Sequence, residues 1–469
     1  MAATCCAQIA GVLGSGVYSV GTDFYNATQA SYWSTQEALL SPACVFLPQT
    51  SAEVATFIFT ISNITNCNFA VKTQGHAPAA GFANIDDGVT LDLSWLNETV
   101  ISDDLSTASV GPGSAWLDVY TTLNPYNKTV AGGRNGAVGV GGLTLGGGIS
   151  YYSPQVGWTC DTVVNFEIVL ASGDVVNANA TSNCELYRAL KGGGNNFGVV
   201  TKIDFTTVEA VPLRAGHLFQ SQDYTIQVLD AFAGIASAED YDVHASIVAS
   251  FSFNKTTGVW TIVSVPIYTL PETDPDVYHE LFAIPNITEL TTVSIENIST
   301  LAAEAPYPQK FEAFYTSTYA ASSDLLVTLF NVANKTLQST PYPIDVSVSL
   351  TFEPLPTVMT QHGEGTNSLG TSQSDGNGVI LLLSFSWINS DSTAAAEQFG
   401  LMLLGELDEA ARGLGGLHDF KYLNYADARQ DPLSTYGEAN LDFLRSISMQ
   451  YDPEGIFQTR VPGGFKLWV

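Results

Sequence analysis

Basic residues are scarce in this chain of 469 residues. Only 16 lysines and arginines stand against 46 aspartates and glutamates, which gives a formal net charge of −30. A protein that binds nucleic acid or an anionic membrane surface needs clustered cations to neutralise phosphates. We therefore expect neither nucleic acid nor a membrane among the partners of this protein.

The sequence also lacks long apolar runs and the common metal and nucleotide motifs. The apolar segment 7–17 is too short to span a bilayer and no charged stretch precedes it, so we interpret the chain as a mature protein whose signal peptide has been removed. No Cys-x-x-Cys pair or His/Cys cluster occurs, so no metal site is expected. No Gly-Lys-Ser/Thr occurs, which excludes a Walker phosphate loop.

Six cysteines and nine Asn-x-Ser/Thr sequons favour a secreted, N-glycosylated protein. An even number of cysteines fits disulfides, although buried free thiols are an alternative. We predict that the first two cysteines join an N-terminal arm to the next two and that the last two form a pair: Cys5 and Cys6, Cys44 and Cys67, Cys160 with Cys184. The sequons stand at Asn26, Asn63, Asn97, Asn127, Asn179, Asn254, Asn286, Asn297 and Asn334.

Glycine is the residue that organises the first part of the chain. Nine of the seventeen residues from Gly132 to Gly148 are glycine. Each glycine costs backbone entropy and packs no side chain, so this run predicts neither a regular helix nor a strand. Because glycine has no Cβ atom, backbone N–H groups can approach a flat or charged ligand closely, and a dinucleotide is the ligand we expect. Reading from Gly139, the third glycine of the common dinucleotide fingerprint falls on Thr144, so that motif is excluded.

The first 210 residues read as short, alternating helices and strands. Thr50 and Glu53 form a capping box, and apolar residues then recur at helical spacing as far as Ile61. We expect Ser114 to cap a second helix. Strands are expected at 68–73, 88–93 and 199–205, a hairpin from 163 through the turn at 171–174, and a short helix at 185–190.

After about residue 210 the pattern changes to long apolar and polar alternation. This alternation predicts an antiparallel sheet with helices on one face and a free face that can roof a ligand. The strands are expected at 244–253, 258–268, 345–352 and 379–387, and the helices near 224–235, 276–283, 322–338 and 392–412. From about residue 415 the chain returns to the first part, with a strand at 420–425 and a helix at 437–450. The fold class predicted is α+β.

Four motifs in a fixed order resemble one family. Gly75-His76 follows a strand, the glycine run comes next, and Leu-Lys-Gly-Gly-Gly-Asn-Asn-Phe-Gly-Val-Val-Thr follows at 190–201. Asn424-Tyr425 and the Tyr-Asp-Pro of 451–453 stand near the end. This arrangement resembles the FAD-linked oxidases of the vanillyl-alcohol oxidase and berberine bridge enzyme type, over about 40–210 and 415–469. It implies a PCMH-type FAD-binding domain in two parts, 1–210 and 415–469, with a substrate-binding domain inserted at 211–414, and the sequence has a fungal character.

The resemblance implies how FAD is held. It implies a covalent bond from His76 to the 8α carbon of the flavin, although a lone Gly-His would more often cap a turn. Many members add a second bond from a cysteine, and the matching residue here is Asn135, so we expect one bond only. The resemblance places Val138 where a small side chain admits O2 to the flavin. The alternative is that Val138 is a core residue. The other candidate FAD contacts are Thr73, Gln74, Gly75, Ala77, Pro78, Gly81, Gly139, Gly141, Gly142, Gly147, Gly194, Asn195, Gly198, Val199 and Asn424.

Oxidation of an alcohol requires a base that takes the hydroxyl proton as hydride leaves carbon. Tyr422 is the first candidate, with Tyr425 and Glu353 beside it, and the alternative is that both tyrosines are ordinary strand aromatics. We therefore expect a secreted, monomeric FAD-dependent oxidase that passes hydride from an alcohol-type donor to flavin N5 and reduces O2 to H2O2. The donor would be an oligosaccharide or a natural-product intermediate. The alternatives are a dehydrogenase that excludes O2, a non-redox cyclase of the same fold, and a sugar-binding module without flavin.

Overall fold

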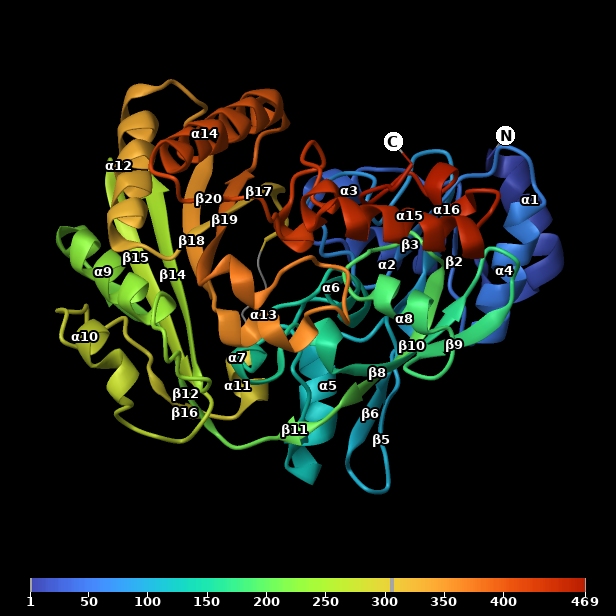
Figure 1. The fold of residues 1–469 in the computed structure, drawn as a ribbon. Coiled ribbons are helices and arrows are strands. Elements are labelled where there is room, and N and C mark those ends of the chain that lie inside the picture. The colour runs from blue at the N-terminus through green and yellow to red at the C-terminus, as the bar shows by residue number, and fades with distance from the viewer. Residues whose placement is uncertain (1, 304–307, 469) are drawn as a thin grey trace.

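The computed structural model describes residues 2–303 and 308–468, and two sheet systems stand side by side in it (Figure 1). The first system, at the right of the view, holds the N-terminus and also the C-terminal helices α15 (Glu438–Tyr451) and α16 (Ile456–Thr459). The second system, at the left, is a large antiparallel sheet covered by helices. The predicted α+β class is confirmed.

The first system contains two larger sheets and one two-stranded sheet within the described residues. One has the order β1 (Val17–Ser19), β2 (Cys44–Phe46), β4 (Val89–Asp92) and β3 (Phe69–Lys72), with β2, β4 and β3 parallel. The other is antiparallel, in the order β5 (Thr99–Ile101), β6 (Thr107–Val110), β10 (Val199–Thr206), β8 (Val163–Val169) and β9 (Val175–Asn179). A small pair joins β7 (Lys128–Thr129) to β11 (Val208–Glu209).

Helices fill the space around these sheets. Thr50 caps α4 (Ser51–Ser62) as predicted, because its hydroxyl accepts the Glu53 N–H at 3.2 Å. The Glu53 carboxylate accepts the Gln49 N–H at 2.6 Å and not that of Thr50, so the second bond of the predicted capping box is displaced by one residue. The other helices of this system are α1 (Ala2–Leu13), α2 (Asp23–Ala30), α3 (Thr35–Ala38), α5 (Trp116–Leu123), α6 (Val140–Leu145), α7 (Ser153–Val156) and α8 (Cys184–Leu190). Helix α15 packs against α8, which returns the end of the chain to the first system.

Nine strands of the described chain form the second sheet. Their order is β16 (Ser294–Glu296), β12 (Leu213–Ala215), β15 (Val259–Tyr268), β14 (Ala245–Asn254), β18 (Ser347–Leu355), β19 (Gly378–Trp387), β17 (Phe311–Ala320) and β20 (Leu417–His418), with β13 (Leu218–Gln220) paired to β15. Helices α9 (Thr225–Ala236), α12 (Ser323–Ser339) and α14 (Thr393–Gly413) cover one face (Figure 1), and the short helices are α10 (His279–Phe282), α11 (Ile298–Ala302) and α13 (Thr357–Gly363). In the described parts of the chain, no helix combines the length and apolarity that crossing a bilayer requires.

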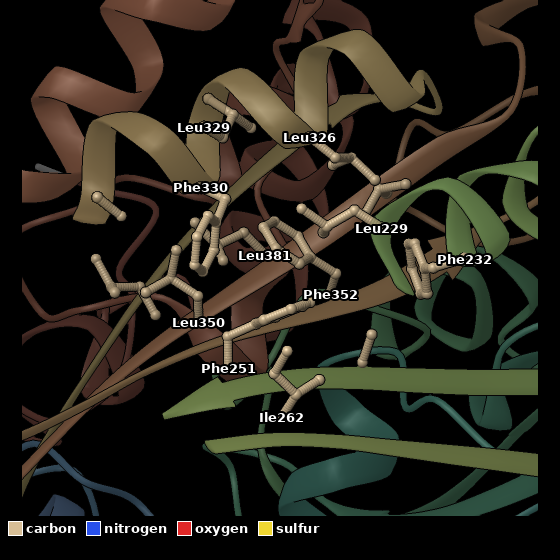
Figure 2. Packing of buried hydrophobic residues seen from close by; sticks show 14 of the residues in the cluster. Leu229, Phe232, Phe251, Ile262, Leu326, Leu329, Phe330, Leu350, Phe352 and Leu381 are labelled. Atoms are coloured by element: carbon tan, nitrogen blue, oxygen red, sulfur yellow. The ribbon is translucent and has the colours of Figure 1, made fainter. Parts of the chain in front are cut away.

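The largest core lies between this sheet and its helices. Figure 2 shows Phe251 of β14, Phe352 of β18 and Leu381 of β19 packed with Phe330 of α12 and Phe232 of α9. All five side chains are buried, and each contributes about 1.5–3 kcal/mol by leaving water. Successive side chains of a strand point to opposite faces, so the residues between these core positions face away from the helices. The second face of the sheet is therefore free to line a site.

Strand β17 was not predicted, although it lies between β19 and β20. Its first residues alternate between buried and half-buried, but every residue from Tyr315 to Tyr319 is buried. A strand buried on both faces loses the period of two on which sequence prediction depends.

Three local predictions were wrong. Residues 420–425 are not a strand: the Tyr425 N–H donates to the Tyr422 carbonyl at 3.0 Å and closes a 3-10 turn over Leu423–Tyr425. Ser114 does not cap α5, because its hydroxyl donates to the carbonyl of Asn97 at 3.0 Å. The glycine run does contain a helix, α6, because tertiary hydrogen bonds there outweigh the low helix propensity of glycine.

The cysteine pairing was right for the arm and wrong for the last pair. Disulfides Cys5–Cys67 and Cys6–Cys44 attach α1 to the rest of the first system, and in each of them the two Cα atoms lie 6.0 Å apart. Cys160 is a buried free thiol and Cys184 is an exposed free thiol. Cys160 lies in the core of the first system and Cys184 at the surface at the start of α8, so the two side chains do not meet.

The thiol content of the denatured protein tests this arrangement. When the protein is unfolded without reductant, it should expose two reactive thiols per chain, at Cys160 and Cys184, because the other four cysteines form disulfides. Thiol titration followed by peptide mass mapping measures this number. Recovery of a Cys160–Cys184 peptide pair would contradict the structure.

Candidate functional site

A cavity of about 790 Å³ lies where the two systems meet. The segments that line it include the loop after β3, the glycine run, the start of β10, the free face of the large sheet, and the returning C-terminal chain. Its volume is within the range of about 300–1,000 Å³ that small-molecule and cofactor sites occupy. Sequence segments separated by more than 300 residues therefore share one site.

Most of the predicted site residues line this cavity. They are Thr73, Gly75, His76, Ala77, Pro78, Asn135, Val138, Gly139, Gly141, Gly142, Gly194, Asn195, Gly198, Val199, Glu353, Tyr422, Asn424 and Tyr425. Three predicted residues do not line it. The Gln74 side chain donates to the Gly113 carbonyl, the Gly81 N–H donates to Glu37, and the Gly147 N–H donates to the Thr144 carbonyl.

The glycines of the run have two different roles. A Cβ on Gly139 or Gly141 would lie 2.9 Å from Gln74 or 2.8 Å from Thr73, so these two glycines let the run pack against the loop after β3. A Cβ on Gly142 would meet no atom within 4 Å, and one on Gly194 would come no closer than 3.8 Å. Both of these glycines line the cavity, so their missing side chains leave space for a ligand.

His76 stands at the cavity wall with one ring face covered. Its imidazole stacks on Trp33, with ring centroids 4.4 Å apart and planes inclined by 18°. Burial lowers the pKa of His76 from 6.5 to about 4 because the charged imidazolium loses its hydration. The imidazole is therefore neutral, with one free nitrogen lone pair, at any pH well above 4.

A buried polar cluster forms another part of the cavity wall. Arg134 Nη2 donates to Glu353 Oε1 at 2.8 Å and to the Tyr425 hydroxyl at 2.8 Å, and the Tyr425 hydroxyl donates to the same carboxylate oxygen at 3.0 Å. Glu353 is 3% exposed, and its second oxygen, Oε2, has no hydrogen-bond partner among the described residues. A buried carboxylate oxygen without a partner costs free energy unless a ligand satisfies it.

Tyr422 lies beside this cluster with its oxygen already occupied. The Tyr422 oxygen accepts the N–H of Gly148 at 3.1 Å and an amide N–H of Asn424 at 3.0 Å. Its ring contacts Tyr425 edge to face at a centroid distance of 4.8 Å. Burial raises the pKa of Tyr422, so the neutral phenol is favoured.

The free face of the large sheet supplies an apolar wall. Val248, Val265, Phe314 and Leu382 come from four different strands and all line the cavity. Glu353 is the charged residue that this sheet adds to the lining. The sheet thus presents one carboxylate in an apolar surface.

Comparison with known proteins shows the family. The family described as "FAD binding domain" matches residues 42–179. The FAD-dependent monooxygenase drtC of Aspergillus calidoustus is 34% identical over 99% of this chain and 90% of its own length. This chain belongs to the family of FAD-linked oxidoreductases to which this relative belongs.

Solved structures show the same fold for this FAD-linked oxidoreductase. 6-Hydroxy-D-nicotine oxidase from Arthrobacter nicotinovorans superimposes with a TM-score of 0.79 at 20% identity, covering 94% of this chain and 96% of that one. Berberine bridge enzyme from Eschscholzia californica gives 0.78 at 16% identity and covers all of both chains.

The cavity of this FAD-linked oxidoreductase fits FAD. Gly142 and Gly194 leave open space beside backbone, where a diphosphate needs close approach. Arg134 is the one lysine or arginine in the lining formed by described residues, and it is paired with Glu353, so the diphosphate would depend on backbone N–H groups. No cysteine is among the described lining residues, and the histidines among them are His76 and His217.

Sequence reasoning missed Arg134, Phe314 and Trp33. Arg134 is the one charged residue within the glycine run, and that contrast was a usable signal. Phe314 belongs to the unpredicted strand β17, so no pattern identified it. Trp33 lies before the matched FAD domain, and only the fold brings it to His76.

A side chain at Gly142 should exclude FAD. Gly142→Leu places four carbons in open cavity space without displacing any protein atom within 4 Å of its Cβ, so we expect folded protein with at least about tenfold less bound flavin. Absorbance at flavin wavelengths per protein chain measures it. Gly405→Leu, at an exposed helical glycine that also has open space, is the matched control and should keep its flavin. Full flavin content in Gly142→Leu would place FAD elsewhere.

Proposed function

We propose that this protein is a secreted FAD-dependent oxidase that removes hydride from an alcohol-type donor and passes the electrons to O2, forming H2O2. When bound, FAD accepts the two electrons and the hydrogen that leave the donor carbon. Per turnover, one C–H and one O–H bond of the donor break, a carbonyl forms, and O2 takes up two electrons and two protons. The following residues support this proposal.

Glu353 Oε2 carries the proposal. It is a buried carboxylate oxygen at the cavity wall with no partner among the described residues, and it needs a hydrogen-bond donor there. The hydroxyl of an alcohol is such a donor. Arg134 and Tyr425 hold the other carboxylate oxygen, so Glu353 keeps its orientation while Oε2 takes the hydroxyl proton.

Glu353 is the better base than Tyr422. A hydroxyl oxygen has two acceptor positions, and both of those on Tyr422 are filled by Gly148 and Asn424. What Tyr422 retains is its own O–H, which is available to donate to the donor oxygen or to the cofactor. We therefore assign proton removal to Glu353 and positioning of the substrate to Tyr422.

The apolar wall favours a natural-product intermediate over an oligosaccharide. Val248, Val265, Phe314 and Leu382 offer no hydrogen-bonding groups to the many hydroxyls of a sugar chain. A hydroxylated, largely apolar ring would bury against them and present its hydroxyl to Glu353. Oxygen uptake with aryl or alicyclic alcohols, compared with uptake with oligosaccharides, tests this class directly.

Surface features support secretion and glycosylation. Two disulfides hold α1, as an oxidising compartment permits. Seven of the nine sequon asparagines are exposed, and the remaining two, Asn179 and Asn334, are half-buried. We propose N-linked glycans at exposed sequons, and intact mass before and after enzymatic deglycosylation measures them.

Monooxygenation is the second candidate, because the relative that shares 34% identity over nearly the whole chain bears that name. A monooxygenase would place one atom of O2 in the product and needs two further electrons from a reductant. Turnover under ¹⁸O2 separates the two: label in H2O2 alone supports the oxidase, and label in the organic product supports the monooxygenase. Reduced flavin that persists in air would indicate a dehydrogenase, and anaerobic turnover without flavin reduction would indicate a cyclase.

Removing the base should slow flavin reduction. Glu353→Gln keeps the shape and loses the proton acceptor, so we expect the rate of flavin reduction by an alcohol donor to fall by about 10²–10⁴-fold. Stopped-flow absorbance measures it. Tyr422→Phe should cost no more than about tenfold, and the exposed control Glu239→Gln should match the wild type. A larger loss in Tyr422→Phe than in Glu353→Gln would reverse the assignment.

The covalent link through His76 has its own test. After denaturing electrophoresis and acid treatment, the wild-type band should fluoresce under ultraviolet light, and His76→Ala should give a dark band while still binding FAD in the folded state. Because the pKa of His76 is about 4, attachment to apo-protein should proceed equally at pH 6 and pH 8. A fluorescent band in His76→Ala would assign the link to another residue.

A further inference from the structure

Residues 32–37, named here the strap, run between the loop that carries His76 and strand β17 of the large sheet. The strap precedes the matched FAD domain, which begins at residue 42. Tyr32 is 3% exposed, and Ser34 and Glu37 are fully buried. A buried segment of this kind holds the elements on its two sides in a fixed relation.

Backbone and side-chain hydrogen bonds join the strap to the His76 loop on both sides of the histidine. The Trp33 N–H donates to the Gly75 carbonyl at 3.1 Å, and the Ser34 hydroxyl donates to the Ala77 carbonyl at 3.1 Å. The residues just before and just after His76 are thus fixed to consecutive residues of the strap. The loop cannot turn around His76 without breaking one of these bonds.

The far end of the loop is fixed by a buried carboxylate. Glu37 accepts the N–H of Gly81 at 3.1 Å and the N–H of Ala83 at 2.6 Å, and the Tyr32 hydroxyl donates to the Ala83 carbonyl at 2.9 Å. Carboxylate bonds to N–H groups are among the stronger hydrogen bonds of a protein. This explains the position of Gly81, which the sequence placed at the cofactor.

The other side of the strap is fixed to the large sheet. The Thr35 N–H donates to the Lys310 carbonyl at 2.7 Å, beside the bridge that pairs Ser34 with Lys310. The Gln36 amide donates to the Glu312 carbonyl and accepts the Glu312 N–H at 3.2 Å. The His76 loop is therefore positioned relative to β17, which also supplies Phe314 to the cavity.

Trp33 is the one strap side chain that stacks on His76. The two rings lie nearly parallel at 4.4 Å, and the Trp33 ring also contacts Phe314 at 5.4 Å. The lone pair of an imidazole nitrogen lies in the plane of the ring. Fixing that plane therefore fixes the line along which the nitrogen can attack a carbon atom.

We propose that Trp33 is a positioning residue for the attachment of FAD to His76, with the strap holding the loop and the indole holding the imidazole plane. This inference rests on the proposed covalent link. In the attachment, a nitrogen–carbon bond forms between His76 and the 8α methyl group. The imidazole N–H and one methyl C–H are lost, and O2 receives the two electrons and two protons as H2O2.

The rate of attachment tests the role of Trp33. Apo-protein is mixed with FAD, samples are precipitated in acid over time, and flavin absorbance that stays with the protein is measured. Trp33→Phe keeps a flat ring and should attach FAD at close to the wild-type rate. Trp33→Leu removes the ring face and should slow attachment by about tenfold or more while total bound FAD before precipitation stays unchanged.

A matched control separates positioning from loss of stability. Trp260→Leu removes a buried tryptophan of the large sheet that contacts Phe253 and Phe330 and does not contact His76. It should attach FAD at the wild-type rate. Where Trp33→Leu does not fold, Trp33→Met replaces it, since the flexible thioether fills the space without a flat face.

Each outcome decides between the two proposals. A wild-type protein that binds FAD but retains none in acid would overturn the His76 link and this inference with it. A covalent wild type together with Trp33→Leu at the wild-type rate would overturn the inference alone. Equal slowing in Trp260→Leu would attribute the effect to stability and would also overturn it.

Discussion

The ion pair between Arg134 and Glu353 is the interaction on which the site depends, because it joins the two sheet systems inside the cavity. Arg134 comes from the glycine run and Glu353 from the large sheet, 219 residues apart. Tyr425, from the returning chain, donates to the same carboxylate oxygen. Breaking such a buried pair by removing one partner leaves an uncompensated charge and typically costs about 3–5 kcal/mol. The pair therefore fixes the orientation of the Glu353 carboxylate in the site and also the position of the two sheet systems relative to each other.

Side chains alternate along β18 between the helix-covered face of the large sheet and the face that lines the cavity. Phe352 packs into the helical core and its neighbour Glu353 faces the cavity, so adjacent residues serve stability and chemistry separately. A shift of register by one residue would bury the carboxylate among leucines and expose the phenylalanine. The tightly packed core of Figure 2 thus also specifies where the carboxylate points.

Sequence reasoning recovered what local patterns encode. The N-cap at Thr50, the long strands β14 and β15, and the α+β class followed from local sequence patterns. The glycine segments at His76 and Gly142, which motif order grouped together, line one cavity. It failed where tertiary structure decides. Strand β17 is buried on both faces, Cys160 and Cys184 look alike in sequence but differ in burial, and the turn at Tyr422 exists because the chain leaves the sheet to reach the cavity. The strap could not have been foreseen, since its partners lie about 40 and 275 residues away.

The return of the C-terminal chain into the first system has a consequence for biosynthesis. Gly464 and Phe465 line the same cavity as Val71 and Thr73, so the cavity wall is complete only once residues 464 and 465 have been made. Domains of most proteins fold as they emerge during synthesis, but this cavity closes through contacts of very high sequence separation, which form late. The cofactor must therefore reach a chain that has been synthesised at least as far as residue 465, and its supply is needed in the compartment where that chain folds.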